Sequence, residues 1–201
     1  MSKILYIEND KELTESFQEV VLDMGDGWQV EIVHHMAGAE GKIRGTKDYE
    51  AYVIDVMLPK NADELKKLES LELERLKKLD KLTGIRGRSD GDMERGFELR
   101  KEIDWLDLEI DKHLDKEGGI GLLKLICSVR SDRIKYGKLH LPVVFWTARS
   151  APELKRSCEE LVDEKFLGWI EKPEDEEFVY DTIKGLLEAA QRKQQKKERN
   201  G

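Results

Sequence analysis

The chain has 201 residues, a formal net charge of −8 and two cysteines, Cys127 and Cys158. This length allows one domain with an elaboration, or one domain plus a small second one, and the acidic balance argues against nonspecific nucleic-acid binding over the whole surface. The cysteines lie in helix-like stretches without metal-ligand spacing, so a reduced, cytoplasmic protein is expected and a disulfide framework is not.

Short apolar runs alternate with helical patterns along the chain. The first run, residues 4–7, begins almost at the N-terminus, which argues against a signal peptide, and no run approaches membrane-spanning length. Between about Lys11 and Met24 apolar residues recur at helical spacing, with Asp10 as the expected N-cap. The elements expected after it are strand 28–33, a weaker helix 36–44, strand 51–54, helix 119–129, strand 142–146, helix 153–162, strand 166–170 and helix 176–190.

This alternation of strands and helices predicts the fold class. The apolar runs are short and rich in β-branched and aromatic residues, as strands buried on both faces are. Strands that alternate with helices form a doubly wound parallel sheet with right-handed crossovers. We therefore predict an α/β protein with five parallel strands.

Residues 60–117 interrupt the alternation. This stretch is rich in charge and shows no strand pattern, but it has two helical stripes: Leu65, Leu68, Leu76, Leu79 and Leu82, then Leu99, Ile103, Leu106, Ile110 and Leu114. Turn-forming residues at 83–91 separate the stripes. We predict an inserted antiparallel helical hairpin within a discontinuous domain of residues 1–59 and 118–190, followed by a polar, basic tail at 191–201.

The strands of this sheet end in residues suited to phosphate and metal chemistry. The predicted strands lead into Glu8 and Asn9, Asp55, Thr147, and Lys172. Ligands of an open parallel sheet bind at the carboxyl ends of its strands, so these side chains should converge on one edge. Phosphoryl transfer to a carboxylate needs a nucleophile, a hard cation and fixed donors. Asp55 is the candidate nucleophile, with Lys172 as a point charge and Thr147 as a hydroxyl donor.

The strings around these residues resemble the receiver domain of two-component response regulators. The matching strings are ILYIEND at 4–10, IDVMLP at 54–59, VVFWTA at 143–148 and WIEKP at 169–173, and GIGLLKLI at 119–126 is similar to the start of the family's third helix. The likeness covers about residues 1–59 and 118–190 in the family's order. It implies a flavodoxin-like, or receiver-like, sheet with strand order 2-1-3-4-5.

The resemblance implies that Asp55 accepts a phosphoryl group from a histidine kinase or a histidine phosphotransfer protein. A Mg²⁺ ion would be bound by Glu8, Asn9, Asp55 and the backbone carbonyl of Met57. No enzymatic activity beyond self-catalysed phosphoryl transfer and dephosphorylation is implied.

The resemblance also assigns roles at the other two strand ends. Thr147 would be the switch hydroxyl and Trp169 the switch aromatic residue. Lys172 would bind a phosphoryl oxygen, and its bond to Pro173 would be a cis peptide.

Two features depart from the family pattern. Asn9 stands where the family has a metal-binding aspartate; an amide oxygen still binds Mg²⁺ but brings no charge, so weaker metal affinity is expected. The long insertion follows Pro59, beside the expected acceptor site, and could sense the phosphoryl group, block or recruit a partner, or be a rigid decoration.

Three functions remain open. The first is a receiver that signals to an unknown downstream protein by protein contacts; no output domain follows the last helix, so direct DNA binding is unlikely. The second is an unphosphorylated pseudo-receiver scaffold that works through its insertion. The third is a magnesium-dependent hydrolase or nuclease, which would need a second carboxylate where Met57 stands. A homodimer through the two inserted helices is a further hypothesis.

Overall fold

The computed structural model describes residues 2–46, 48–85, 90–148, 152–172 and 174–199. Five strands form one parallel sheet in the order β2-β1-β3-β8-β9, which is the predicted 2-1-3-4-5 order counted along the chain. Their bounds are β1 (Lys3–Ile7), β2 (Gln29–Val33), β3 (Tyr49–Ile54), β8 (Val143–Thr147) and β9 (Leu167–Glu171). The α/β prediction is confirmed.

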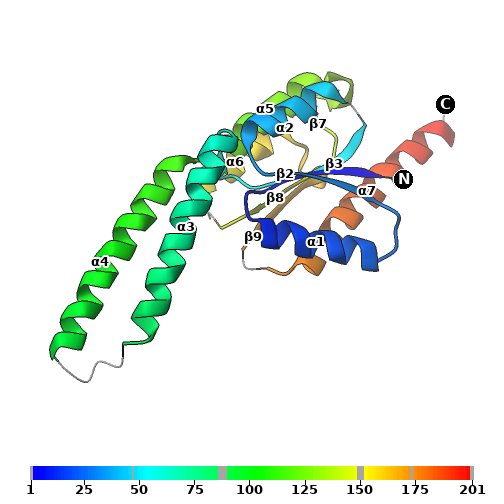
Figure 1. Ribbon diagram of the computed structural model, residues 1–201. Coiled ribbons are helices and arrows are strands. Elements are labelled where there is room, and N and C mark those ends of the chain that lie inside the picture. The colour runs from blue at the N-terminus through cyan, green and yellow to red at the C-terminus, as the bar shows by residue number, and fades with distance from the viewer. Residues whose placement is uncertain (1, 47, 86–89, 149–151, 173, 200–201) are drawn as a thin grey trace.

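Helices cover both faces of this sheet (Figure 1). One face packs against α1 (Lys11–Asp23) and α7 (Glu176–Arg199), and the other against α2 (Met36–Gly45), α5 (Gly118–Val129) and α6 (Pro152–Leu161). Strand β1 shows why both faces are apolar. Ile4 and Tyr6 pack in the core on the α1 and α7 side, and Leu5 and Ile7 pack in the core on the α2, α5 and α6 side. Alternate residues of a strand point to opposite faces, so a strand covered on both sides must be apolar throughout.

The insertion is a pair of antiparallel helices, as predicted. It consists of α3 (Ala62–Thr83) and α4 (Asp90–His113), and it projects from the sheet domain (Figure 1). The Asn61 side chain caps α3 by accepting hydrogen bonds from the backbone N–H groups of Asp63 and Glu64, both at 3.0 Å. Between the two helices, Lys78 Nζ lies 2.7 Å from Glu102 Oε2, and Arg75 pairs with Asp107.

A short strand pair closes the root of the hairpin, where no strand was predicted. β4 (Leu58–Pro59) pairs antiparallel with β5 (Leu114–Asp115). Two residues are too few to show the alternation by which a strand is recognised in a sequence. The pair holds the two ends of the insertion side by side.

One residue of the predicted hairpin core is exposed. Leu65, Leu68, Ile103 and Leu106 are buried, but 58% of Leu76 is accessible to solvent. Leu76 therefore does not belong to the buried contact between α3 and α4.

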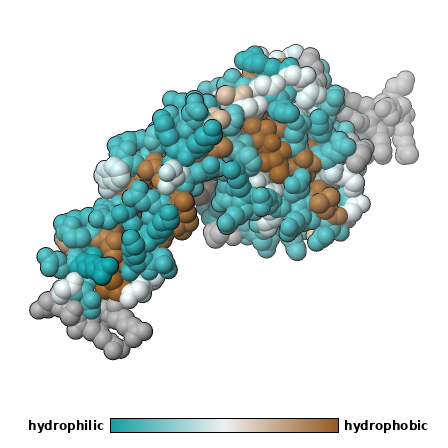
Figure 2. All heavy atoms as spheres, viewed as in Figure 1, coloured by the Kyte–Doolittle hydropathy of each residue, from teal (hydrophilic) through white to brown (hydrophobic). Residues whose placement is uncertain are grey.

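Other large apolar side chains of the hairpin also reach the surface. Figure 2 shows apolar patches along the hairpin, between polar side chains. The large apolar residues of the hairpin with more than half of their surface exposed are Leu73, Leu76, Met93, Phe97, Trp105 and Leu108. The inserted helices thus carry more apolar surface than their mutual contact buries.

Several short elements complete the chain. A second two-stranded pair, β6 (Ile134–Lys135) and β7 (Lys138–Leu139), is joined by two residues with positive φ, and short 3₁₀ turns lie at η1 (Ser131–Arg133) and η2 (Glu164–Phe166). Helix α7 continues to Arg199, beyond the end expected near Ala190. No helix in the described part of the chain combines the length and apolar character that a bilayer span requires.

Candidate functional site

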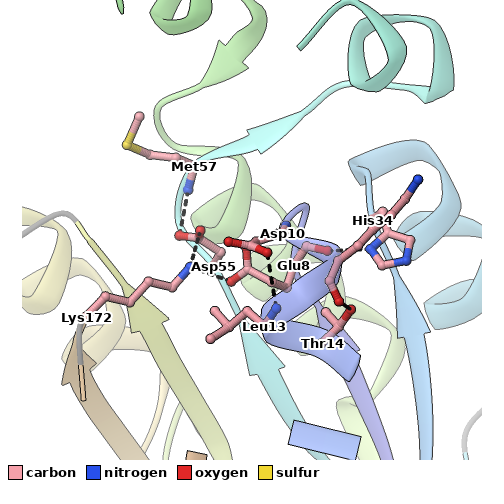
Figure 3. A network of polar contacts seen from close by, with 9 residues as sticks. Glu8, Asp10, Leu13, Thr14, His34, Asp55, Met57 and Lys172 are labelled. Atoms are coloured by element: carbon pink, nitrogen blue, oxygen red, sulfur yellow. Dashed lines mark hydrogen bonds and ion pairs between the residues drawn. The ribbon is translucent and has the colours of Figure 1, made fainter. Parts of the chain in front are cut away.

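Two carboxylates lie together at the carboxyl edge of the sheet, as the strand ends predicted. Asp55 follows β3 and Glu8 follows the neighbouring strand β1 (Figure 3). The backbone N–H of Asp55 donates to the carbonyl of Ile7 at 2.9 Å. Asp55 is 6% exposed and Glu8 is 1% exposed. Parallel pairing of the two strands therefore places both acidic groups at the same edge.

Lys172 joins the two carboxylates. Its ammonium group lies 2.6 Å from Glu8 Oε2 and 3.2 Å from Asp55 Oδ2 (Figure 3). It reaches them because it follows β9, where its backbone N–H donates to the Thr147 carbonyl at 3.0 Å. Burial by itself would lower the pKa of Lys172, but the Glu8 and Asp55 carboxylates raise the pKa above its usual value.

The environment of Glu8 changes its acidity. Burial and the nearby Asp55 charge raise the pKa of Glu8 to about 7, although its ion pair with Lys172 opposes them. One ammonium group thus offsets only part of the charge of two buried carboxylates. The site has the electrostatic character of one that accommodates further positive charge.

Backbone groups fix the carboxylates from the other side. The N–H of Met57 donates to Asp55 Oδ1 at 3.2 Å, and the N–H of Asp10 donates to Glu8 Oε1 at 3.1 Å. The start of α5 packs directly on the loop after Asp55: the N–H of Gly119 donates to the Val56 carbonyl at 3.1 Å. A Cβ atom at Gly119 would lie 2.4 Å from the Asp55 carbonyl oxygen, so only glycine fits here.

Most of the predicted site residues line one open cavity of about 570 Å³. The structure brings together Glu8, Asn9, Asp55, Met57, Thr147 and Lys172. Thr147 is fully buried and Asn9 is half-buried. The convergence that the strand ends predicted is present.

Two predicted features are not part of this lining. Trp169 is half-buried on β9 and packs against Phe145, with ring centroids 5.4 Å apart, on the side of the sheet that α5 and α6 cover. The peptide bond between Lys172 and Pro173, predicted to be cis, lies outside the described residues. The switch role of Trp169 stays a prediction.

The oxygen atoms at the site suit a hard cation. The carboxylates of Glu8 and Asp55 converge on a single positive charge, the Lys172 ammonium group. Within the described residues, no three His, Cys, Asp or Glu side chains gather as metal ligands. Mg²⁺ would therefore need the Asn9 amide, the Met57 carbonyl and water besides two carboxylates, and such all-oxygen ligation is what Mg²⁺ prefers.

Several residues around the site were not predicted from the sequence. From the insertion, Glu69, Glu72, Leu73 and Leu76 of α3 line the same cavity. Leu76 was assigned to the helical stripe of the hairpin, and no periodicity in the sequence marks these four residues as cavity-lining. The His34 imidazole lies 2.8 Å from the Glu8 carbonyl oxygen (Figure 3), and no pattern in the sequence indicates that contact.

Comparisons with protein-family models and with curated proteins find no match. Solved structures do match. The response regulator receiver domain protein (CheY-like) from Methanospirillum hungatei JF-1 is 14% identical with a TM-score of 0.56, covering 96% of this chain and 98% of that one.

Two further matches have similar values. The N-terminal domain of a response regulator/sensory box/GGDEF 3-domain protein from Carboxydothermus hydrogenoformans is 15% identical, with a TM-score of 0.53 and coverage of 96% and 98%. A two-component response regulator from Clostridium difficile is 17% identical, with a TM-score of 0.51 and coverage of 94% and 97%. At these identities the likeness establishes the fold: the chain has the fold of the CheY-like response regulator receiver domains, with a helical hairpin inserted after the third strand.

Proposed function

We propose that this chain is a phosphoacceptor signalling protein in which Asp55 receives a phosphoryl group. The observation that carries the proposal is the Lys172 ammonium group bound to both Glu8 and Asp55 in a cavity open to solvent. The receiver fold supports it, because signalling receivers share this sheet and place their chemistry at its carboxyl edge. We expect the protein to act in the cytoplasm and to signal to an unknown downstream protein.

The donor in this proposal is a phosphohistidine of a histidine kinase or a histidine phosphotransfer protein. An Asp55 carboxylate oxygen attacks phosphorus, the P–N bond breaks, and its electron pair stays on the imidazole nitrogen, which takes a proton from water. Lys172 binds one phosphoryl oxygen as a point charge and the Thr147 hydroxyl donates to another. Glu8, Asn9, Asp55 and the Met57 carbonyl would hold a Mg²⁺ ion, which would supply positive charge against the phosphoryl oxygens.

Labelling with a small phosphodonor tests this function. Wild type and Asp55→Asn are incubated with acetyl phosphate and Mg²⁺, then resolved on a phosphate-affinity gel. The wild type should shift and Asp55→Asn should not, while Asp63→Asn, at the exposed start of α3, should behave as wild type. Equal labelling of wild type and Asp55→Asn contradicts the proposal.

A second candidate is a pseudo-receiver scaffold that is not phosphorylated and works through its insertion. Asn9 favours it, because an uncharged amide in the cavity weakens the attraction for a divalent cation. Beryllium fluoride, a phosphoryl mimic, separates the two candidates through tryptophan fluorescence. A change that Trp169→Phe abolishes supports the receiver, and no change in wild type supports the scaffold.

The insertion also offers a surface for self-association. Phe97, Trp105 and Leu108 of α4 are each more than half exposed, and a second copy of the hairpin would cover apolar surface of this kind. Sedimentation at increasing concentration tests for a homodimer. A monomer at every concentration counts against it.

A further inference from the structure

The inserted hairpin forms one wall of the acceptor cavity. Helix α3 contributes Glu69, Glu72, Leu73 and Leu76 to the lining, opposite Asp10 and Glu12 at the start of α1. An ion pair joins the two helices, with Lys11 Nζ 2.6 Å from Glu69 Oε1. A molecule that reaches Asp55 from solvent therefore passes residues of the insertion.

The mouth of this cavity is acidic. Four carboxylates line it, from Asp10, Glu12, Glu69 and Glu72, and Lys11 is engaged by Glu69. Partial burial raises the pKa of Glu72, and the Asp10 and Glu69 carboxylates raise it further, while the Arg75 guanidinium opposes them. Of the residues the structure describes, none forms an ion pair with Glu72. The Glu72 carboxylate therefore acts on the charge of molecules that enter the cavity.

We infer that α3 makes this cavity selective against free anionic phosphodonors and in favour of a phosphohistidine presented by a protein. This inference rests on the proposed acceptor role of Asp55. A free acyl phosphate carries about two negative charges at neutral pH and must bring both past the acidic wall. A protein donor brings the same phosphoryl charge on its imidazole, but it can place basic side chains against the wall, while exposed Leu73 and Leu76 offer apolar contact.

Two small phosphodonors that differ in net charge test how the acidic wall affects phosphoryl transfer. With acetyl phosphate, Asp55 forms an O–P bond and the P–O bond to the acetyl group breaks, releasing acetate. With phosphoramidate, the P–N bond breaks and ammonia leaves. Phosphoramidate has the phosphorus–nitrogen bond of phosphohistidine, and its protonated nitrogen offsets part of the negative charge.

The test compares initial rates of Asp55 labelling by both donors in full-length wild type, Glu72→Lys and Glu74→Lys. Glu74 is the matched control: it lies on the same helix and undergoes the same charge change, but it pairs with Lys78 at 3.5 Å in a groove beside Trp105 and away from the cavity. Both positions are exposed, and thermal unfolding checks that both variants fold.

Glu72→Lys should raise the acetyl phosphate rate about threefold, for charges about 10 Å apart at about 0.1 M ionic strength. The rise with phosphoramidate should be less than about twofold, and both gains should shrink towards none near 1 M salt, where the Debye length is about 3 Å. Glu74→Lys should leave both rates close to wild type.

The outcomes separate the inference from the function on which it rests. If wild type labels at Asp55 but Glu72→Lys has no effect, or Glu74→Lys has the same effect, the inference is overturned while the acceptor role stands. Equal gains with both donors overturn it as well. If wild type and Asp55→Asn label alike, the acceptor role fails and the inference fails with it.

Discussion

At the scale of single residues, the site is defined by an imbalance of charge. Two nearly buried carboxylates, Glu8 and Asp55, share the one ammonium group of Lys172. Burying a charged group destabilises a fold unless an opposite charge pairs with it. Removing one partner therefore leaves the remaining buried charge uncompensated, and the free energy of unfolding falls. The same imbalance that lowers stability here would favour binding of a cation, which the proposed acceptor role of Asp55 requires, so that proposal places stability and function in competition at these residues.

Lys172→Met should therefore destabilise the fold by about 2 kcal/mol, less than for a fully buried pair because Lys172 retains some solvent access. Denaturant unfolding of the variant measures the loss. The double variant Lys172→Met/Asp55→Asn lacks one of the two uncompensated carboxylates, so it should recover part of the lost stability. Lys184→Met, which breaks an exposed pair with Asp26, should cost much less stability than Lys172→Met. Equal losses at Lys172 and Lys184 would contradict the charge argument.

Most of the site residues were predictable because one geometric rule covers them. The carboxyl ends of parallel strands share an edge, so Glu8, Asp55 and Thr147 had to be neighbours once the strand order was known. The rule does not apply to Trp169, because this residue lies within β9 and its ring packs on the α5 and α6 side of the sheet. The His34 contact with the Glu8 carbonyl depends on a loop conformation that no sequence period encodes.

At the scale of elements, α5 and the loop after β3 depend on a close backbone contact. A Cβ at Gly119 would lie 2.4 Å from the Asp55 carbonyl oxygen and 2.9 Å from the Val56 Cα, and neither atom can move without shifting the acceptor. Gly121, two residues later, has only the Met36 Cε at 4.0 Å. The two glycines thus differ in packing while sharing a helix.

Gly119→Ala should destabilise the protein by about 2 kcal/mol through overpacking and should slow Asp55 labelling, because relief of the clash displaces the acceptor. Gly121→Ala should be neutral or stabilising by up to about 1 kcal/mol, since alanine favours the helix. Thermal unfolding and acetyl phosphate labelling measure both effects. The close contact would be refuted by a Gly119→Ala protein that matched Gly121→Ala in both assays.

Edge strand β2 is tied to its neighbours by Glu31. Its carboxylate pairs with Lys3 of β1 at 3.3 Å and with Lys42 of α2, and it accepts a hydrogen bond from the Tyr49 hydroxyl. The Lys42 and Tyr49 hydrogen bonds lower the pKa of Glu31 from 4.5 to about 2, with partial burial opposing them and Lys3 adding to them. The charged form of Glu31 is the stabilising one.

A carboxyl group with a depressed pKa in the folded state stabilises above its unfolded pKa and loses that contribution as the pH falls through its folded pKa. Glu31→Gln should thus cost about 1 kcal/mol at pH 7, allowing for solvent screening of partly exposed pairs. The difference from wild type should shrink as the pH falls from about 4.5 towards 2. Urea unfolding across that range measures it, with exposed Glu15→Gln as control; a difference that stays constant with pH would count against the ion pairs.

At the scale of the whole molecule, the sheet domain and the hairpin have separate apolar cores. Leu65, Leu68, Ile103 and Leu106, the buried residues of the two inserted helices, belong to neither of the clusters that flank the sheet. Periodicity predicted each unit because each has its own amphipathic pattern. It could not predict how they meet, because the two-residue β4–β5 pair and the Lys11–Glu69 ion pair, which join the two units, follow no sequence period. The contribution of α3 to the lining of the cavity could therefore not be predicted from the sequence.

Separate cores predict that the hairpin can be removed. Pro59 and Leu114 face each other in the β4–β5 pair, so replacing residues 60–113 with Asn-Gly closes the chain as a two-residue β-hairpin loop. The shortened protein should unfold cooperatively and lose helical circular dichroism. Because the acidic residues of α3 are gone, acetyl phosphate should label Asp55 at least about threefold faster than in the full chain at about 0.1 M ionic strength.

The two readouts distinguish the roles that the insertion can have. A shortened protein that folds and labels faster identifies the hairpin as a wall that restricts access to Asp55. If it folds but labels no faster, α3 has no influence on the donor. If it fails to fold, while Glu72→Lys and Glu74→Lys in the full chain remain stable, the hairpin supports the sheet domain through the root at β4 and β5, and the two cores are coupled rather than separate.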